Sequence, residues 1–430
     1  MVRTDGNVIA LNVPGSKSIT NRALLIAALA KGESVLKGVL FSDDSRHFLD
    51  CLNELGFLTE IDENSRSVKI NGLSGKLPKK EASLNVGSAG TAARFITAFL
   101  GLSKGGAYHL DSSEQMKKRP MKELLDSLTE LGCDISYDGN EGHFPYTIRG
   151  KGFLKPETTV NIDKSSQFLS ALLISSVLSK EDFTVHTTGA HGMAYIDMTL
   201  RMMWEFSVDV MRMGNDYVIS RGQKYTAREY EIEPDMSAAA YFYAAGALTG
   251  ANVRVDGVHF DSMQGDIEFL RILEKMGCEL KDTDEGIVLT PPVSGKLKGV
   301  DADMSAFSDQ ALTLAAIAPY ADSPVIIRNI GHIRLQECDR LNAMEKNLTA
   351  LGIQCETDAD SIKIYPGVPK GCEIETYEDH RVAMSFALTG LLVPGVEIIN
   401  PSCCKKTFED YFDVFDEFTQ KVSELRKRNE

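Results

Sequence analysis

The feature that most constrains the fold of this chain is an internal repeat with a period of about seventy residues. Six segments share one design, in which a polar or charged opening is followed by a run rich in Ala, Leu and Ser. They begin at residues 16, 87, 165, 235, 308 and 378. Equivalent residues recur at steps of 72, 71 and 70 positions, namely Arg22 to Arg94, Ser166 to Ser237 and Asp309 to Asp379.

A second marker runs in phase with the first. Amphipathic segments end on an apolar residue followed by Gly, which enters the left-handed conformation cheaply. These ends are Leu55-Gly56, Leu131-Gly132, Met276-Gly277 and Leu351-Gly352, with Phe206-Ser207 in the remaining slot. Short alternating stretches closed by Gly or Pro follow them and predict strands. The alternative is a chance spacing of unrelated α/β segments, which two markers in phase disfavour.

Each unit therefore predicts strands alternating with two helices, in an α/β fold. One helix, with Ala and Ser on every face, is expected to be packed on all sides, and the other is amphipathic. Six such units exceed a single hydrophobic core, so two domains of three units are expected. The midpoint falls near residues 231–234. We expect residues 15–233 to form the first domain, and residues 1–14 together with 234–430 to form the second.

Composition narrows the class of protein. The chain is 43% hydrophobic and 25% charged, as in soluble globular proteins. No apolar run reaches the roughly 18 residues that span a bilayer, and the first residues resemble no signal peptide, so a cytoplasmic location is expected. The net charge of −15 argues against nucleic-acid binding, but an acidic protein can still hold small anions in a basic pocket. The eight cysteines form no CxxC pair and are expected to be reduced thiols.

Lys17, Ser18 and Arg22 lie at the expected start of the first buried helix, in the stretch PGSKSITNRALL. A helix N-terminus offers free N–H groups and the positive end of its dipole, which makes it a natural anion site. The order Gly-Ser-Lys-Ser without an upstream Gly is not a nucleotide-binding P-loop. The alternative is a solvated helix start with no ligand.

Further blocks follow in a fixed order: GSAGTAAR with Ser88, Gly90 and Thr91; KKRP with Arg119; SSQFLSALL with Ser165, Ser166 and Gln167; AYIDMT with Tyr195; SDQALTLA with Asp309; IRLQECDRL with Glu337 and Arg340; YEDHRVAM with His380 and Arg381; and KKTFEDYF with Lys406. Together they resemble the family of 5-enolpyruvylshikimate-3-phosphate synthases (3-phosphoshikimate 1-carboxyvinyltransferases) over nearly the whole chain. The resemblance implies a monomer with two inside-out α/β-barrel domains, each of three repeated units, and an active site between them.

The same resemblance implies a reaction and a set of roles. The family joins phosphoenolpyruvate to the 5-hydroxyl of shikimate 3-phosphate by addition and elimination through a tetrahedral intermediate, without metal or cofactor. Asp309 and Glu337 suit the acid and base roles, and Lys17 would stabilise the phosphate leaving group. The implied contacts to shikimate 3-phosphate are Lys17, Ser18, Arg22, Ser165, Ser166, Gln167, Tyr195, Asp309, His332 and Gln336. Those to phosphoenolpyruvate are Lys17, Ser88, Gly90, Thr91, Arg119, Gln167, Arg340, Arg381 and Lys406.

The chemistry explains these residue types. Two phosphates and two carboxylates must share one site, and anions about 4 Å apart repel by roughly 1 kcal/mol per pair in water and more in a partly dry site. Six of the implied contact residues are cations that can offset this repulsion: Lys17, Arg22, Arg119, Arg340, Arg381 and Lys406. The four Arg among them suit bidentate contacts to carboxylate and phosphate. No His, Cys or Asp cluster has metal-ligand spacing, so activity without a metal is expected.

Each assignment has a plainer alternative. Asp309 alone could cap a helix, Glu337 and Arg340 could form a surface ion pair, and His380 could be a packed helix start. Other enzyme alternatives are the UDP-N-acetylglucosamine enolpyruvyl transferases, although DSSEQMKKRP lacks their reactive Cys, and the RNA 3′-phosphate cyclases, which the negative charge disfavours. A non-catalytic binding protein of the same fold is the remaining alternative.

The sequence departs from the family chiefly where the shikimate phosphate would bind. Gln336 stands in place of a usual Lys, and Gly192 in place of a Ser. His332, Ser88 and Phe95 also differ from the common residues. Because a cation is lost at position 336, affinity for that phosphate is expected to be weaker unless Lys164 compensates.

Overall fold

Contacts divide the chain of this computed structural model, which describes residues 2–429, into two compact units. Unit 1 comprises Met1–Pro14 and Glu233–Glu430, and unit 2 comprises Gly15–Ile232. The prediction of a mixed α/β chain is confirmed, since helices and strands alternate throughout both units.

Three four-stranded sheets make up the β structure of unit 2, and they share one pattern. A parallel pair is followed by two antiparallel partners, in the orders β14-β3-β5-β4, β6-β7-β9-β8 and β10-β11-β13-β12. The strands are β3 (Lys31–Lys37), β4 (Thr59–Asp62), β5 (Ser67–Leu73), β6 (Glu81–Asn85), β7 (Ala107–Asp111), β8 (Asp134–Tyr137), β9 (Tyr146–Arg149), β10 (Glu157–Asn161), β11 (Phe183–Thr188), β12 (Met211–Met213), β13 (Asp216–Ile219) and β14 (Glu229–Glu231).

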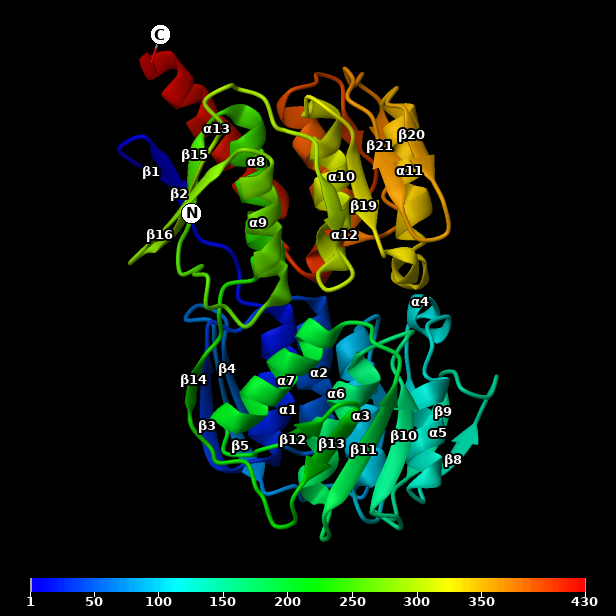
Figure 1. Cartoon of the computed structure of the whole chain (residues 1–430). Helices are drawn as coiled ribbons and strands as arrows, with labels where there is room; N and C mark the ends of the chain where they lie inside the picture. Colours follow the sequence, from blue (N-terminus) through cyan, green and yellow to red (C-terminus); the bar gives the residue numbers. More distant parts are fainter. Residues whose placement is uncertain (1, 430) are drawn as a thin grey trace. The chain divides into compact units, whose positions relative to one another are not determined.

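Three helices rich in small residues form the centre of unit 2, with the strands around them (Figure 1). They are α1 (Lys17–Leu29), α3 (Gly90–Leu102) and α6 (Gln167–Ser175), and each contacts the other two. Every residue of α3 is buried, and so is every residue of α1 from Ile19 onward, so the prediction of all-round packing is confirmed for these helices. The other helices of this unit are α2 (Asp43–Glu54), α4 (Glu114–Lys117), α5 (Lys122–Glu130), α7 (Met193–Glu205) and the 3₁₀ turn η1 (Ser176–Leu178).

Unit 1 varies the same sheet pattern. One sheet has the order β18-β19-β21-β20, another has the order β1-β2-β15-β17-β16, and the last is only the parallel pair β22-β23. The N-terminal strands β1 (Val2–Asp5) and β2 (Val8–Leu11) belong to this unit because β2 pairs in parallel with β15 (Asn252–Val255). The other strands are β16 (Glu279–Thr283), β17 (Gly286–Thr290), β18 (Asp301–Asp303), β19 (Val325–Arg328), β20 (Cys355–Thr357), β21 (Ile362–Ile364), β22 (Glu373–Ile374) and β23 (Glu397–Ile398).

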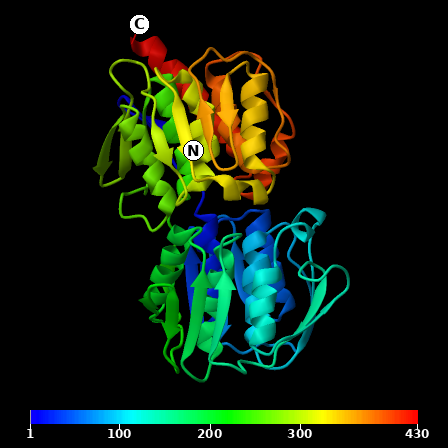
Figure 2. The same cartoon turned by 45° about the vertical axis from the view of Figure 1, so that its right-hand side comes forward.

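The buried helices of unit 1 are α8 (Met236–Thr249), α10 (Ala311–Ile317) and α12 (His380–Ala387). Around them lie α9 (Glu268–Lys275), α11 (Arg340–Ala350) and α13 (Tyr411–Asn429), and Figure 2 shows α11 beside the strands β20 and β21. Short 3₁₀ segments join these elements: η2 (Gly265–Ile267), η3 (Ser308–Gln310), η4 (Ala318–Tyr320), η5 (Gly331–Leu335), η6 (Leu388–Leu391) and η7 (Pro401–Lys406).

Two of the six segments rich in Ala, Leu and Ser do not form a single α-helix. The segment 308–321 divides into η3, α10 and η4, where Pro319 cannot donate to the helical ladder. The segment 378–393 passes from α12 into η6. In both cases a short α-helix is flanked by a tighter turn, and the turn η3 carries Asp309.

The predicted helix ends are confirmed. Gly56, Gly132, Gly277 and Gly352 all have positive φ, between 79° and 105°, and each follows a helix. Ser207 takes the same conformation, with φ of 73°, in the slot where the sequence has no Gly. Among residues 2–429, no helix combines the length and apolarity that crossing a membrane requires.

Candidate active site

A buried guanidinium organises the polar cluster of unit 1. Arg340, the first residue of α11, is 2% exposed and donates to three carboxylates, each at 2.8 Å. Its Nε reaches Asp379 Oδ2, its Nη1 reaches Asp309 Oδ1 and its Nη2 reaches Glu337 Oε2. Burial alone would lower the pKa of Arg340, but the three carboxylates outweigh it and raise that pKa. The plainer alternative of a surface ion pair between Glu337 and Arg340 is therefore wrong.

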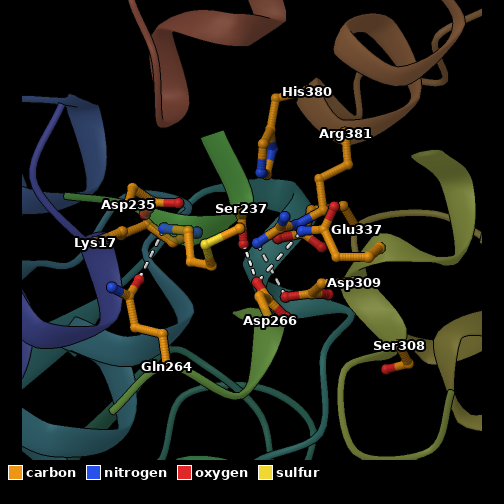
Figure 3. A network of polar contacts seen from close by, with 12 residues as sticks. Lys17, Asp235, Ser237, Gln264, Asp266, Ser308, Asp309, Glu337, His380 and Arg381 are labelled. Atoms are coloured by element: carbon orange, nitrogen blue, oxygen red, sulfur yellow. Dashed lines mark hydrogen bonds and ion pairs between the residues drawn. The ribbon is translucent and has the colours of Figure 1, made fainter. Parts of the chain in front are cut away.

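Asp309 and Glu337 each contact a second cation. Arg381 Nη2 lies 2.9 Å from Asp309 Oδ2, and Lys406 Nζ donates to Glu337 Oε1 at 3.2 Å. Figure 3 shows Asp309, Glu337 and Arg381 pointing toward one another. A carboxylate that is largely removed from water needs cations or donors around it, and both of these partly buried carboxylates have them.

Asp309 lies inside the 3₁₀ turn η3. The N-cap of that turn is Phe307 and the N-cap of α10 is Gln310, so the alternative in which Asp309 caps the helix is wrong. The turn leaves the Asp309 carboxylate directed at Arg340 and Arg381.

Asp379 belongs to this polar cluster, although the sequence analysis used it only to measure the repeat. It is fully buried, caps α12 by accepting from the backbone N–H of Arg381 at 2.9 Å, and holds Arg340 with both oxygens. One side chain thereby holds the Arg340 guanidinium and the backbone at the start of the helix that carries Arg381. The available signal was its position, since an Asp directly before a buried helix that opens with His380-Arg381 is a natural cap.

His332 and Gln336 flank this cluster. His332, in η5, makes a 2.7 Å hydrogen bond between its Nε2 and Ser308 Oγ, and burial lowers its pKa below the usual range. It is therefore a neutral imidazole at pH 7. Gln336 ends η5 and is half-buried.

In unit 2, Arg22 is a second buried guanidinium. Its Nε donates to Thr199 Oγ1 at 2.8 Å, its Nη1 donates to the Ser18 carbonyl at 2.9 Å, and its Nη2 donates to Ser170 Oγ and to the Tyr195 carbonyl. Burial lowers its pKa to about 10, so it keeps its charge at pH 7. These bonds fix Arg22 between α1, α6 and α7. Lys17, at the start of α1, lies 3.5 Å from the buried Asp44.

The glycine-rich segment begins α3 and lies against two further guanidinium groups. A Cβ at Gly90 would lie 2.5 Å from Arg94 Nη1 and 2.6 Å from Arg119 Nη1, so only glycine fits without moving them. Arg94 Nη1 donates to the Gly90 carbonyl at 3.0 Å and to Gln167 Oε1 at 3.3 Å. Arg94 is thus a second residue that the sequence reasoning missed, although it marked the repeat.

The serine pair lies next to these groups, at the start of α6. Ser165 Oγ accepts from the backbone N–H of Gln167 at 3.3 Å, and Gln167 Nε2 donates to Thr91 Oγ1 at 3.4 Å. Gly192, with φ of 67°, lies beside Ser166. Lys164 is half-exposed and contacts Glu123 at 2.7 Å.

The structure brings the predicted residues together in one set in unit 1 and in a set of two groups in unit 2, around Arg22 and around Gly90. The set in unit 1 contains Asp309, Glu337, Arg340, Arg381, Lys406 and, beside them, His332 and Gln336. The set in unit 2 contains Arg22 with Ser18 and Tyr195, and Gly90 with Thr91, Arg119, Ser165, Ser166 and Gln167, while Ser88 lies in the turn before α3 and Lys17 lies beside Asp44. Among the residues described, no group of three or more His, Cys, Asp or Glu is arranged to hold a metal ion.

Comparison with known proteins covers the part of the chain that holds these residues. The sequence model of the family "EPSP synthase (3-phosphoshikimate 1-carboxyvinyltransferase)" matches residues 3–415. The 3-phosphoshikimate 1-carboxyvinyltransferase of Nostoc punctiforme is 46% identical over 407 residues, which cover 94% of this chain and 95% of that protein. The enzyme of the same name from Shewanella baltica is 40% identical over 412 residues, with 94% and 95% covered.

A solved structure agrees with the sequence matches. EPSP synthase from Acinetobacter baumannii superposes with a TM-score of 0.80 at 25% identity, over 95% of each chain. A full-length match at this level covers both polar sets, and not one unit alone. This chain belongs to the EPSP synthase family.

Proposed function

We propose that the protein transfers the enolpyruvyl group of phosphoenolpyruvate to the 5-hydroxyl of shikimate 3-phosphate and releases phosphate, as the shikimate-pathway step that its family name describes. The observation that carries this proposal is the pair Asp309 and Glu337, each held by two cations around Arg340. Two positioned carboxylates are what a proton-transferring addition and elimination needs. The UDP-N-acetylglucosamine acceptor is not favoured, because the family match and the relatives are EPSP synthases.

In the addition step, one carboxylate removes the proton of the 5-hydroxyl, whose oxygen attacks C2 of phosphoenolpyruvate. The other group, as its acid, protonates the methylene carbon to a methyl, which gives a tetrahedral phosphate ketal. In the elimination step, a proton leaves the methyl, the C–O bond to phosphate breaks, and the double bond re-forms. Asp309 and Glu337 take these two roles and exchange direction between the steps.

The bound anions are assigned by charge. Arg340, Arg381 and Lys406 would hold phosphoenolpyruvate in unit 1, and Arg119 with the N–H groups at Ser88 to Thr91 would do so in unit 2. The close approach of Arg119 to the backbone at Gly90, where an added Cβ would lie 2.6 Å from Arg119 Nη1, supports this assignment. Lys17 would stabilise the phosphate as it leaves.

Shikimate 3-phosphate would lie against the other residues of unit 2. Arg22 would meet its carboxylate, Ser165 and Ser166 its phosphate, and Gln167 both substrates, with Ser18 and Tyr195 beside the ring. His332, neutral and bonded to Ser308, would contact its hydroxyls, and Gln336 would add a neutral donor where a Lys is common. Lys164 would have to break its ion pair with Glu123 before it could replace the missing cation, and breaking that pair costs free energy.

We also propose the finer architecture expected from the sequence. The two units would be the two domains of an inside-out α/β barrel, a reading that the shared strand order of the sheets supports. The protein would act as a monomer in the cytoplasm, without metal or cofactor. Turnover that falls on dialysis against EDTA and returns with zinc or magnesium would contradict the metal-free part.

The central test is phosphate release with both substrates, compared between wild type and Asp309→Asn. Loss of a general acid–base group should lower turnover by roughly a hundredfold or more. Asp301→Asn is the matched control, since Asp301 is an exposed carboxylate paired with Arg328 on the surface of the same unit. Near-normal turnover in Asp309→Asn, or release of phosphate only with UDP-N-acetylglucosamine as acceptor, would overturn the proposed function.

A further inference from the structure

Asp266 is a buried carboxylate that the mechanism above does not use. It lies in η2, before α9, and is 7% exposed. Its Oδ2 accepts from Ser237 Oγ, at the start of α8, and from Gln310 Nε2 at 3.3 Å. Figure 3 shows Asp266 between Ser237 and Asp309. Its two hydrogen-bond donors therefore come from two other elements, and one donor is the sequence neighbour of Asp309.

Gln310 extends this hydrogen-bond network toward α12. It is fully buried, it ends the turn that carries Asp309, and its Oε1 accepts from Thr313 Oγ1 at 3.1 Å. Thr313 Oγ1 in turn lies 3.2 Å from Ser385 Oγ, on the helix α12 that carries Arg381. A continuous chain of buried hydrogen bonds thus runs from α8 through Asp266 and the Asp309 turn to α12.

Asp266 is also electrostatically coupled to the cluster. Burial, as the largest cause, raises the pKa of Asp266 to about 6, and the nearby charges of Asp309 and Asp235 add to this effect. Arg381 and the hydroxyl of Ser237 act in the opposite direction. Asp266 therefore changes its charge between pH 5 and 7, and the coupling to Asp309 is reciprocal.

We propose that Asp266 is a positioning residue for Asp309: its bond to Gln310 fixes the turn that carries Asp309, and its negative charge makes Asp309 a stronger base. The inference rests on the proposed acid–base role of Asp309, and specifically on its action as the base in the step that limits kcat. Protonation of Asp266 removes the charge and weakens that base. The value of kcat should therefore rise with pH in a step near pH 6, where Asp266 ionises.

The test is the pH profile of kcat between pH 5 and 8, measured by phosphate release on the full-length enzyme. Asp266→Asn preserves the shape and a hydrogen-bond acceptor but carries no charge, so the step near pH 6 should vanish and kcat should stay at the lower level. Asp266→Ala also loses the acceptor, so kcat should fall further, by roughly ten- to a hundredfold, as the Asp309 turn loosens. A step near pH 6 that persists in Asp266→Asn would overturn the proposal.

Ser237→Ala gives a second test, the position of the kcat step on the pH axis. A purely structural role of Asp266 would leave that position unchanged. The Ser237 hydroxyl stabilises the charged form of Asp266, so its loss should shift the step to higher pH while the step itself remains. A step that stays in place in Ser237→Ala would also count against the proposal. Asp309→Asn separates the two claims: full activity in that variant would sink the proposed role of Asp309, whereas a loss there together with an unchanged profile in Asp266→Asn would sink this inference alone.

Discussion

At Gly192 the backbone conformation disfavours the residue that the family resemblance would lead us to expect there. The family resemblance leads us to expect Ser at this position, so Gly192→Ser would seem to restore a ligand for the shikimate phosphate. In this chain Gly192 has φ of 67°, and a Cβ there would lie 2.5 Å from Ser166 Oγ. A side chain in the left-handed region costs roughly 1–2 kcal/mol before any clash.

We therefore expect Gly192→Ser to lower the thermal midpoint and to raise the KM for shikimate 3-phosphate. Gly214→Ala is the control, because Gly214 has a similar φ of 65° but no atom within 4 Å of the added Cβ. The double variant Gly192→Ser/Ser166→Gly should recover part of the lost stability. A lower KM in Gly192→Ser would show that the serine finds room after all.

Asp266 gives a second prediction at this scale, on stability. Its pKa in the folded protein is about 6, above the roughly 3.9 of an unfolded Asp, so the folded state binds the proton more tightly. The contribution of Asp266 to the free energy of unfolding therefore falls as the pH rises from about 4 to 6. Above pH 6 the buried negative charge destabilises the folded state by its full amount.

Asp266→Asn removes this cost, so it should raise the free energy of unfolding by about 2–3 kcal/mol at pH 8, with a smaller gain at pH 5. Urea denaturation at the two pH values measures the difference. Asp301→Asn should give no such gain, because the hydrogen bonds from Arg328 lower the pKa of Asp301. An equal gain for Asp266→Asn at both pH values would mean that packing, and not charge, is responsible.

At the scale of elements, the start of α3 joins the glycine-rich segment to two guanidinium groups. Gly90→Ala would push Arg94 and Arg119 away from their present positions, since both lie within 2.6 Å of the added Cβ. If Arg119 binds phosphoenolpyruvate, the KM for that substrate should rise about tenfold, equivalent to about 1.4 kcal/mol, with a smaller change for shikimate 3-phosphate. Gly139→Ala, where nothing lies within 4 Å, is the control. Equal KM changes for both substrates would remove Arg119 from the assigned role.

The sequence predicted helices better than it predicted the site. Leu55-Gly56 and its equivalents marked helix ends correctly, because a left-handed residue after an apolar one is a local requirement. The division of 308–321 into turns and a short helix was not predicted, since the Ala-rich pattern fits both conformations. Asp266 and Asp379 were missed because their burial and their partners arise from distant parts of the chain, 44 and 39 residues away.

At the scale of the whole molecule, the two units differ in how the chain builds them. Unit 2 is continuous and contains all the strands of its three sheets, whereas unit 1 needs β1 and β2 from the N-terminal segment. Ile9, Leu11 and Val13 of that segment belong to the hydrophobic core of unit 1. Without them β15 loses its parallel neighbour and the core is left open.

We expect a fragment of residues 15–232 to fold alone and a fragment of residues 233–430 to fail. Joining 1–14 to 233–430 should restore folding, since the backbone N–H of Asp235 already donates to the Pro14 carbonyl at 2.8 Å. Far-UV circular dichroism and the cooperativity of thermal unfolding would compare the three fragments. Cooperative unfolding of 233–430 by itself would show that the N-terminal strands are dispensable.

The pairing of β2 with β15 also has a consequence in time. During synthesis, Leu11 leaves the ribosome 241 residues before Asn252, the first residue of its partner strand. At about 5–20 residues per second, the hairpin of β1 and β2 waits roughly 10–50 seconds for that partner, while the whole of unit 2 emerges. During this interval Val8, Ile9 and Leu11 sit on an open strand edge, the kind of surface that nascent-chain binders cover and that aggregates recruit. A ribosome that stalls before Asn252 prolongs that exposure.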